Sequence, residues 1–138
     1  MHIGFIEDTH LHGGTQIWVA EAMQAFINRN QAVSLLAPEG SWVVDQCRHS
    51  EVLISTYDWD GVVQEDANNQ AIWTESLSKC DVVVCTVHPP REGFHCAVFA
   101  ARCIREGNLR THLISKTGTI VPEYLREFYC PDETIRSS

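Results

Sequence analysis

Two adjacent glycines, Gly13 and Gly14, stand in a short loop. The loop joins an apolar segment, residues 2–6, to a segment with helical periodicity, residues 16–30. Because glycine lacks a Cβ, a ligand can approach the backbone closely at both positions. The unpaired N–H groups at the start of a helix, with the positive end of its dipole, bind phosphate without any lysine or arginine. We predict that Gly13, Gly14 and Thr15 bind a diphosphate, although the same two glycines also suit a tight turn that binds nothing.

A second group of polar side chains follows the most apolar segment of the chain, residues 81–86. It contains His88, Arg91, Glu92 and His95, and two prolines stiffen the backbone between them. Imidazole and carboxylate groups bond to sugar hydroxyls, and a guanidinium can bind a phosphate through two parallel bonds. We predict acceptor or sugar contacts here. The alternative is a solvated loop in which Glu92 stabilises the start of the next helix.

Other site types fit these residues poorly. A dinucleotide fingerprint needs G-x-G-x-x-G, and a P-loop needs a glycine upstream of Lys-Thr-Gly-Thr at residues 116–119; the sequence has neither. The candidate metal ligands are His10, His12, His88, His95 and Cys96. Their spacing matches neither a zinc finger nor H-E-x-x-H, so we expect no metal and no cofactor.

Trp59 stands between Asp58 and Asp60 after the predicted third strand. An indole flanked by carboxylates suits an apolar sugar face and its hydroxyl groups. A tryptophan at the end of a strand is also a common, partly buried rim residue. Trp59 is therefore an acceptor-site candidate, with the partly buried rim residue as the alternative.

Composition favours one globular domain. Of the 138 residues, 44% are hydrophobic and 20% are charged, and the formal net charge of -8 disfavours a nucleic-acid partner. The six cysteines form no CxxC pair, and several lie in predicted strands or helices, so we expect reduced core thiols. The apolar runs are too short to span a membrane and no basic leader precedes the first strand, so we expect a cytoplasmic protein without a transmembrane segment.

Strands and helices alternate along the chain. Strands are predicted over residues 2–6, 32–37, 52–56, 81–86 and 110–115. Helices are predicted over residues 16–30, 40–49, 69–79, 93–106 and 123–129, and Gly107 is expected to end the fourth helix in the left-handed conformation. This alternation predicts an α/β, Rossmann-like open parallel sheet of about five strands with helices on both faces. With strand order 3-2-1-4-5, the loops after the first and fourth strands meet at the topological switch point, where ligands bind.

Nearly the whole chain resembles the N-terminal domain of GT-B glycosyltransferases, in particular the retaining family 4 group. Residues 1–15, Met-His-Ile-Gly-Phe-Ile-Glu-Asp-Thr-His-Leu-His-Gly-Gly-Thr, resemble the opening strand and Gly-Gly loop of that family. Residues 32–38, Ala-Val-Ser-Leu-Leu-Ala-Pro, resemble its second strand, which ends in proline. Residues 81–90 resemble its fourth strand and the histidine-bearing loop that follows.

The resemblance implies that residues 1–138 are the acceptor-side domain, with Gly13 and Gly14 close to the donor diphosphate. It also implies a C-terminal donor-binding domain that these residues do not contain, so the chain alone is expected to be inactive. Many members of the family carry a histidine just after the fifth strand. This chain has Lys116 and Thr117 there, and we take both as sugar-binding candidates.

The leading prediction is a domain of a glycosyltransferase that moves a sugar from a nucleotide-sugar donor to a carbohydrate-type acceptor. His10, His88, Glu92 and His95 are the predicted acceptor contacts, and no catalytic base is assigned. The alternative is a stand-alone, flavodoxin-like mononucleotide-binding or regulatory module, since residues 9–15 could equally hold a single phosphate. A third possibility is a structural domain that docks onto a partner chain through an exposed apolar face.

Overall fold

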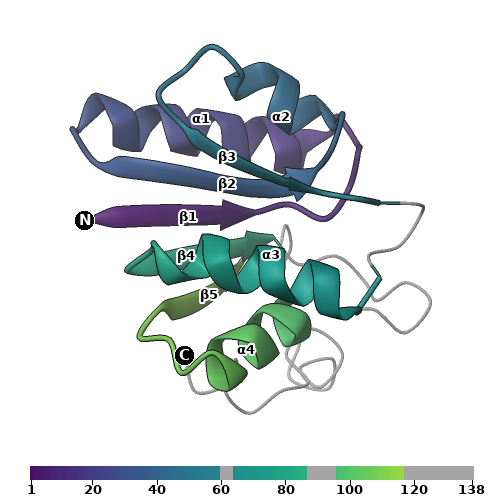
Figure 1. Cartoon of the computed structure of the whole chain (residues 1–138). Coiled ribbons are helices and arrows are strands. Elements are labelled where there is room, and N and C mark those ends of the chain that lie inside the picture. Colours follow the sequence, from purple (N-terminus) through teal and green to yellow (C-terminus); the bar gives the residue numbers. More distant parts are fainter. Residues whose placement is uncertain (60–63, 87–95, 117–138) are drawn as a thin grey trace, which may run out of the picture.

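The computed structural model describes residues 1–59, 64–86 and 96–116. Their five strands form one sheet in the order β3-β2-β1-β4-β5, and every neighbouring pair is parallel (Figure 1). The strands are β1 (His2–Ile6), β2 (Ala32–Pro38), β3 (Leu53–Tyr57), β4 (Val82–Thr86) and β5 (His112–Lys116). The predicted Rossmann-like class is confirmed, and the strand order is the one on which the predicted switch point depends.

In the described part of the chain, four helices cover both faces of this sheet. They are α1 (Gly14–Asn28), α2 (Trp42–Cys47), α3 (Ala67–Ser78) and α4 (Cys96–Glu106). Helices α1 and α2 pack on one face and α3 and α4 on the other (Figure 1). In β1, Ile3 and Phe5 pack in the core under α1 and α2. Ile6 packs in the core under α3 and α4, because neighbouring strand residues point to opposite faces of the sheet. A sheet covered on both sides explains the unbroken apolar runs in its central strands.

The core under α3 and α4 is built around Trp73, which is fully buried. Its ring packs edge-to-face on Phe99, with centroids 4.8 Å apart, and lies 5.3 Å from the ring of Tyr57. These contacts join α3 to α4 and to β3. Truncating such a residue to alanine costs about 3–5 kcal/mol of stability.

Helix α1 begins at Gly14 rather than at the predicted residue 16, and it ends at Asn28 rather than 30. It stops there because Asn30 has a left-handed backbone, with φ of 62°. The N–H groups of Arg29 and Asn30 donate to carbonyls of the last turn, those of Phe26 and Ile27.

The expectation for Gly107 is wrong. The left-handed residue after α4 is Asn108, with φ of 52°. Gly107 is instead a point of close approach, because a Cβ there would lie 2.9 Å from both the Cys103 carbonyl oxygen and Cγ2 of Thr74. The predicted helix over residues 123–129 lies outside the described residues.

Candidate functional site

The candidate site lies at the carboxyl ends of β1 and β4, which are neighbours at the centre of the sheet. The chain leaves β1 toward α1 on one face, whereas α4, which follows β4, packs on the other face (Figure 1). Connections that diverge in this way create the crevice in which open α/β sheets bind ligands. Residues 7–13, which we call the β1–α1 loop, connect β1 to α1 at that position.

The amino end of α1 has a glycine where most helices carry a capping side chain. Gly13 is the N-cap residue, with φ of -126° and ψ of -168°, and it has no side chain to accept from the first-turn amides. The first N–H groups of a helix have no acceptor within the helix itself. A Cβ built on Gly14 would meet no atom within 4 Å, so the space in front of this residue is open. An anion can therefore reach the amides of Gly14 and Thr15.

The amide of Gly13 is already in use. It donates to Oε1 of Gln16 over 2.9 Å, which is half of a capping box. A ligand would have to displace Gln16 to use this N–H group. Of the three residues predicted to bind a diphosphate, the geometry therefore leaves Gly14 and Thr15 as the accessible donors.

A buried carboxylate begins the β1–α1 loop. Glu7 is 0% exposed, and its Oε1 accepts from the Asp8 amide at 3.1 Å and from the Thr9 hydroxyl at 3.0 Å. Its Oε2 lies 3.1 Å from the hydroxyl of Thr86 at the end of β4. Its backbone carbonyl accepts from the Tyr57 hydroxyl at 2.8 Å. One side chain thus ties the loop to the end of β4 beneath the switch point.

Thr9 continues these contacts toward α1. Its Oγ1 accepts from the Leu11 amide at 3.2 Å and from Nε2 of Gln16 at 3.3 Å. Thr9 and Gln16 are 1% and 2% exposed, so the bond between them is shielded from water. Sequence reasoning missed this buried network. Its one readable signal is the glutamine three residues after the N-cap glycine.

Burial raises the pKa of Tyr57 well above its ordinary value, and nearby thiol and carboxyl groups raise it further. The phenol therefore stays protonated and keeps its bond to Glu7. Burial also raises the pKa of Cys96, as does the adjacent Cys85, whose sulfur lies 3.2 Å from the Cys96 sulfur. A thiol with a raised pKa is a poor nucleophile and a poor metal ligand at neutral pH.

Two histidines of the β1–α1 loop each stack on a tryptophan ring from another part of the chain. The His10 ring lies 4.6 Å from the Trp59 ring at 24°, and the His12 ring lies 3.9 Å from the Trp42 ring at 10°. Both histidines are exposed, and a stacked imidazole keeps its two ring nitrogens at its edge. His10 can thus still bond to a ligand, whereas one face of Trp59 is already covered.

Lys116, the last residue of β5, lies on the α1 side of the site. Its Nζ is 4.4 Å from the ring centroid of Trp18, one helical turn after Gly14. Three exposed apolar side chains stand nearby in sequence: Leu11 at 54%, Ile17 at 41% and Trp18 at 37%. The amino end of α1 therefore has an apolar rim with one neighbouring ammonium group.

Five of the predicted site residues lie outside the described residues: His88, Arg91, Glu92, His95 and Thr117. Within the described ranges, no group of three or more His, Cys, Asp or Glu side chains could hold a metal ion. None of the helices in those ranges is long and apolar enough to cross a membrane. The five cysteines there are buried, as expected for core thiols.

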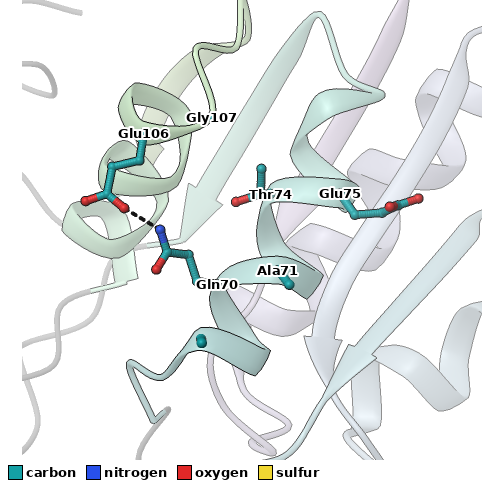
Figure 2. Close-up of a pocket in the computed structure, with 7 residues that line it drawn as sticks. Gln70, Ala71, Thr74, Glu75, Glu106 and Gly107 are labelled. Atoms are coloured by element: carbon teal, nitrogen blue, oxygen red, sulfur yellow. Dashed lines mark hydrogen bonds between the residues drawn. The ribbon is translucent and has the colours of Figure 1, made fainter.

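A cavity of about 440 Å³ lies elsewhere, between α3 and the end of α4 (Figure 2). Figure 2 shows Gln70 on α3 hydrogen-bonded to Glu106 on α4 at its edge. Its lining is mostly small or acidic and includes none of the predicted site residues; it consists of Ala67, Gln70, Ala71, Thr74, Glu75, Glu106 and Gly107. We place the candidate site at the switch point because free donors gather there.

No protein-family model matches the sequence, and no curated protein matches it significantly. Solved structures do resemble it. A glycosyltransferase from Rickettsia africae ESF-5 aligns with a TM-score of 0.64 over 93% of this chain at 12% identity. MurG from Acinetobacter baumannii aligns with a TM-score of 0.57 over 91% of the chain at 13% identity. The chain spans 33% and 38% of those two proteins, and at such low identity the likeness shows the fold.

Proposed function

We propose that this chain is the acceptor-side domain of a GT-B glycosyltransferase, which transfers a sugar from a nucleotide-sugar donor to a carbohydrate-type acceptor. The observation that carries the proposal is the open amino end of α1 at the switch point of the sheet. The fold shared with two glycosyltransferases supports it. The retaining family 4 group is the finer form of the proposal, and its support is the resemblance of residues 1–15 and 32–38.

In this proposal the donor diphosphate binds at the amides of Gly14 and Thr15. Negative charge at the start of a helix is stabilised by about 0.3–1 kcal/mol at an exposed position. Hydrogen bonds from the amides to a charged oxygen add to this value. A local backbone site of this kind can bind an anion even though the chain carries a formal net charge of -8.

The acceptor side of the proposed site includes His10 through its ring nitrogens and Lys116 through its ammonium group. His88, Arg91, Glu92, His95 and Thr117 complete the proposed acceptor and sugar contacts. A second domain would supply most of the nucleotide contacts, which accords with the greater length of the two similar proteins. We therefore expect no turnover by these 138 residues alone. We also propose a cytoplasmic location, where the buried thiols would stay reduced.

The direct test is a titration of the chain with UDP and with GDP, followed by backbone amide chemical shifts. We expect the largest shifts at Gly14 and Thr15. The amide of Asn69 is the internal control, because it lies at the start of α3 but is bonded to Oδ1 of Asp66 at 2.8 Å. Equal shifts at Asn69 and Gly14, or no shift at either, would contradict the proposal.

Flavin mononucleotide serves as a third ligand in the same titration, because one phosphate also fits an open helix start. Binding of the flavin with no binding of UDP or GDP would favour the stand-alone mononucleotide module instead. Preference for a nucleoside diphosphate favours the glycosyltransferase domain.

A further inference from the structure

We propose that Glu7, Thr9 and Gln16 form a buried positioning relay that fixes the β1–α1 loop and selects which amides of α1 remain free. The three side chains are 0%, 1% and 2% exposed and are joined in series by hydrogen bonds. The relay ends at the amide of Gly13, which cannot donate to a ligand while it is bonded to Gln16. The ligand-binding part of this inference rests on the proposed function.

The relay is anchored at Glu7. The amide of this residue donates to the Leu36 carbonyl of β2 at 3.0 Å, and its own carbonyl accepts from Tyr57 of β3. Its carboxylate lies 3.1 Å from the hydroxyl of Thr86 on β4. A buried carboxylate is costly unless it is well bonded, and an apolar side chain would fill the same space at less cost. Contacts with three strands make Glu7 a rigid reference point for the loop.

Thr9 gives the relay its direction. Its hydroxyl has one proton, and two of its neighbours, the Leu11 amide and Nε2 of Gln16, can only donate. The proton must therefore point to Oε1 of Glu7, 3.0 Å away. Only an acceptor at position 7 satisfies this arrangement. The carboxylate thus sets the orientation of a hydroxyl that in turn receives two bonds.

Gln16 needs both ends of its carboxamide. The NH₂ group donates to Thr9 and the oxygen accepts from the Gly13 amide at 2.9 Å. With Nε2 held by Thr9, Oε1 faces the N-cap and keeps the Gly13 amide occupied. The next amides, those of Gly14 and Thr15, remain available to an anion because no side chain caps the turn. The relay therefore acts on the ligand through the backbone.

The test compares Thr9→Val with Thr9→Ser in the full chain without ligand. Valine has nearly the shape of threonine but neither donates nor accepts, whereas serine keeps the hydroxyl. We expect amide hydrogen exchange at Gly13 to be about tenfold faster in Thr9→Val than in wild type and to return in Thr9→Ser. Unchanged exchange at Gly13 in Thr9→Val would overturn the relay.

Thr111→Val is the matched control. Thr111 is also buried, at 9% exposure, and its hydroxyl bonds to the carbonyls of Leu77 and Cys80 near the amino ends of the strands. This variant should lose stability as Thr9→Val does. Its exchange at Gly13 should be no faster than the lower free energy of global unfolding alone would produce. Equal acceleration in both variants would show a merely structural effect and would overturn the proposal. If Thr9→Val does not fold, Gln16→Met removes the last bond of the relay and serves in its place.

Nucleotide binding separates the two proposals. We expect Thr9→Val to bind UDP about tenfold more weakly than wild type, and Thr9→Ser and Thr111→Val to bind it as wild type does. A wild-type chain that binds no nucleoside diphosphate contradicts the proposed function. The exchange measurements, which need no ligand, then test the relay by themselves. Full UDP affinity in a Thr9→Val protein with a fast-exchanging Gly13 amide would overturn the link between relay and ligand.

Discussion

Helices α1 and α3 both begin at the carboxyl end of the sheet, but their first turns are finished differently. At α3, Asp66 caps the helix, and its Oδ1 accepts from the Asn69 amide at 2.8 Å. At α1, Gly13 has no side chain to offer, and the space in front of Gly14 is open. An aspartate cap satisfies a first-turn donor and adds a favourable charge. The comparison shows that α1 forms without either feature, so that its N-cap residue offers no side-chain acceptor to the amides of Gly14 and Thr15.

The largest effect is expected from Gly13→Asp, which would give α1 the cap that α3 has. Its carboxylate would bond to the first-turn amides and would repel a diphosphate. We expect UDP affinity to fall about 100-fold, equivalent to about 2.7 kcal/mol. Stability should change little, because glycine is only a few tenths of a kcal/mol worse than aspartate at an N-cap. Isothermal titration with UDP and urea unfolding measure the two quantities.

Gly13→Ala is the control for that change, because it adds the Cβ without the carboxylate. The new Cβ lies 3.3 Å from Oε1 of Gln16, a contact that a small side-chain shift relieves. A loss of affinity as large as that of Gly13→Asp would show that bulk, rather than charge, closes the site.

Gly14→Ala should separate binding from stability. Alanine is the better helix former, so we expect the free energy of unfolding to rise by up to about 1 kcal/mol. The Cβ would enter the open space where a phosphate is proposed to bind, so UDP affinity should fall about tenfold. Asn28→Ala, at the other end of the same helix, is the control for helix propensity. If Gly14→Ala binds UDP as wild type does, Gly14 is not a point of close approach.

Asp66→Ala should have the opposite profile. Loss of the cap should lower the free energy of unfolding by about 1 kcal/mol and leave UDP affinity within a factor of about two. Asp66→Asn retains an acceptor and should restore most of the stability. Weaker UDP binding in Asp66→Ala would mean that the two helix ends are coupled, which would remove the contrast between them.

Lys116→Met should produce the smallest effect. The ammonium group lies over Trp18, a partly exposed residue one helical turn after Gly14, so its attraction for a diphosphate is screened by solvent. We expect UDP affinity to fall about two- to threefold, and the loss should disappear at 1 M salt, where the screening length is about 3 Å. Arg105→Met, an exposed cation on α4, is the control. A loss of more than tenfold would make Lys116 a principal phosphate ligand.

The alternation of apolar strands with helical segments was sufficient to predict a parallel sheet with helices on both faces, because each element must bury its apolar side. The strand order was a premise taken from the Rossmann type and did not follow from the alternation. The position of the Gly-Gly loop followed from the same alternation. Glu7 could not be predicted as a buried anchor, since an acidic residue after a strand is ordinarily solvated. Its partners Tyr57 and Thr86 are 50 and 79 residues away, and only the folded sheet brings them together. Gly107 was misread because a left-handed turn and a close helix contact both favour glycine.

The open start of α1 also bears on how the sequences of such domains diverge. Peptide groups are the same at every position, so a site made from them depends on the path of the chain and on the absence of bulk at one residue. Most side chains along the sheet and helices can then be exchanged over evolutionary time without loss of the ligand. A shared fold of this kind is therefore better detected by comparing structures than by comparing sequences, in keeping with TM-scores of 0.57 and 0.64 at identities of 13% and 12%.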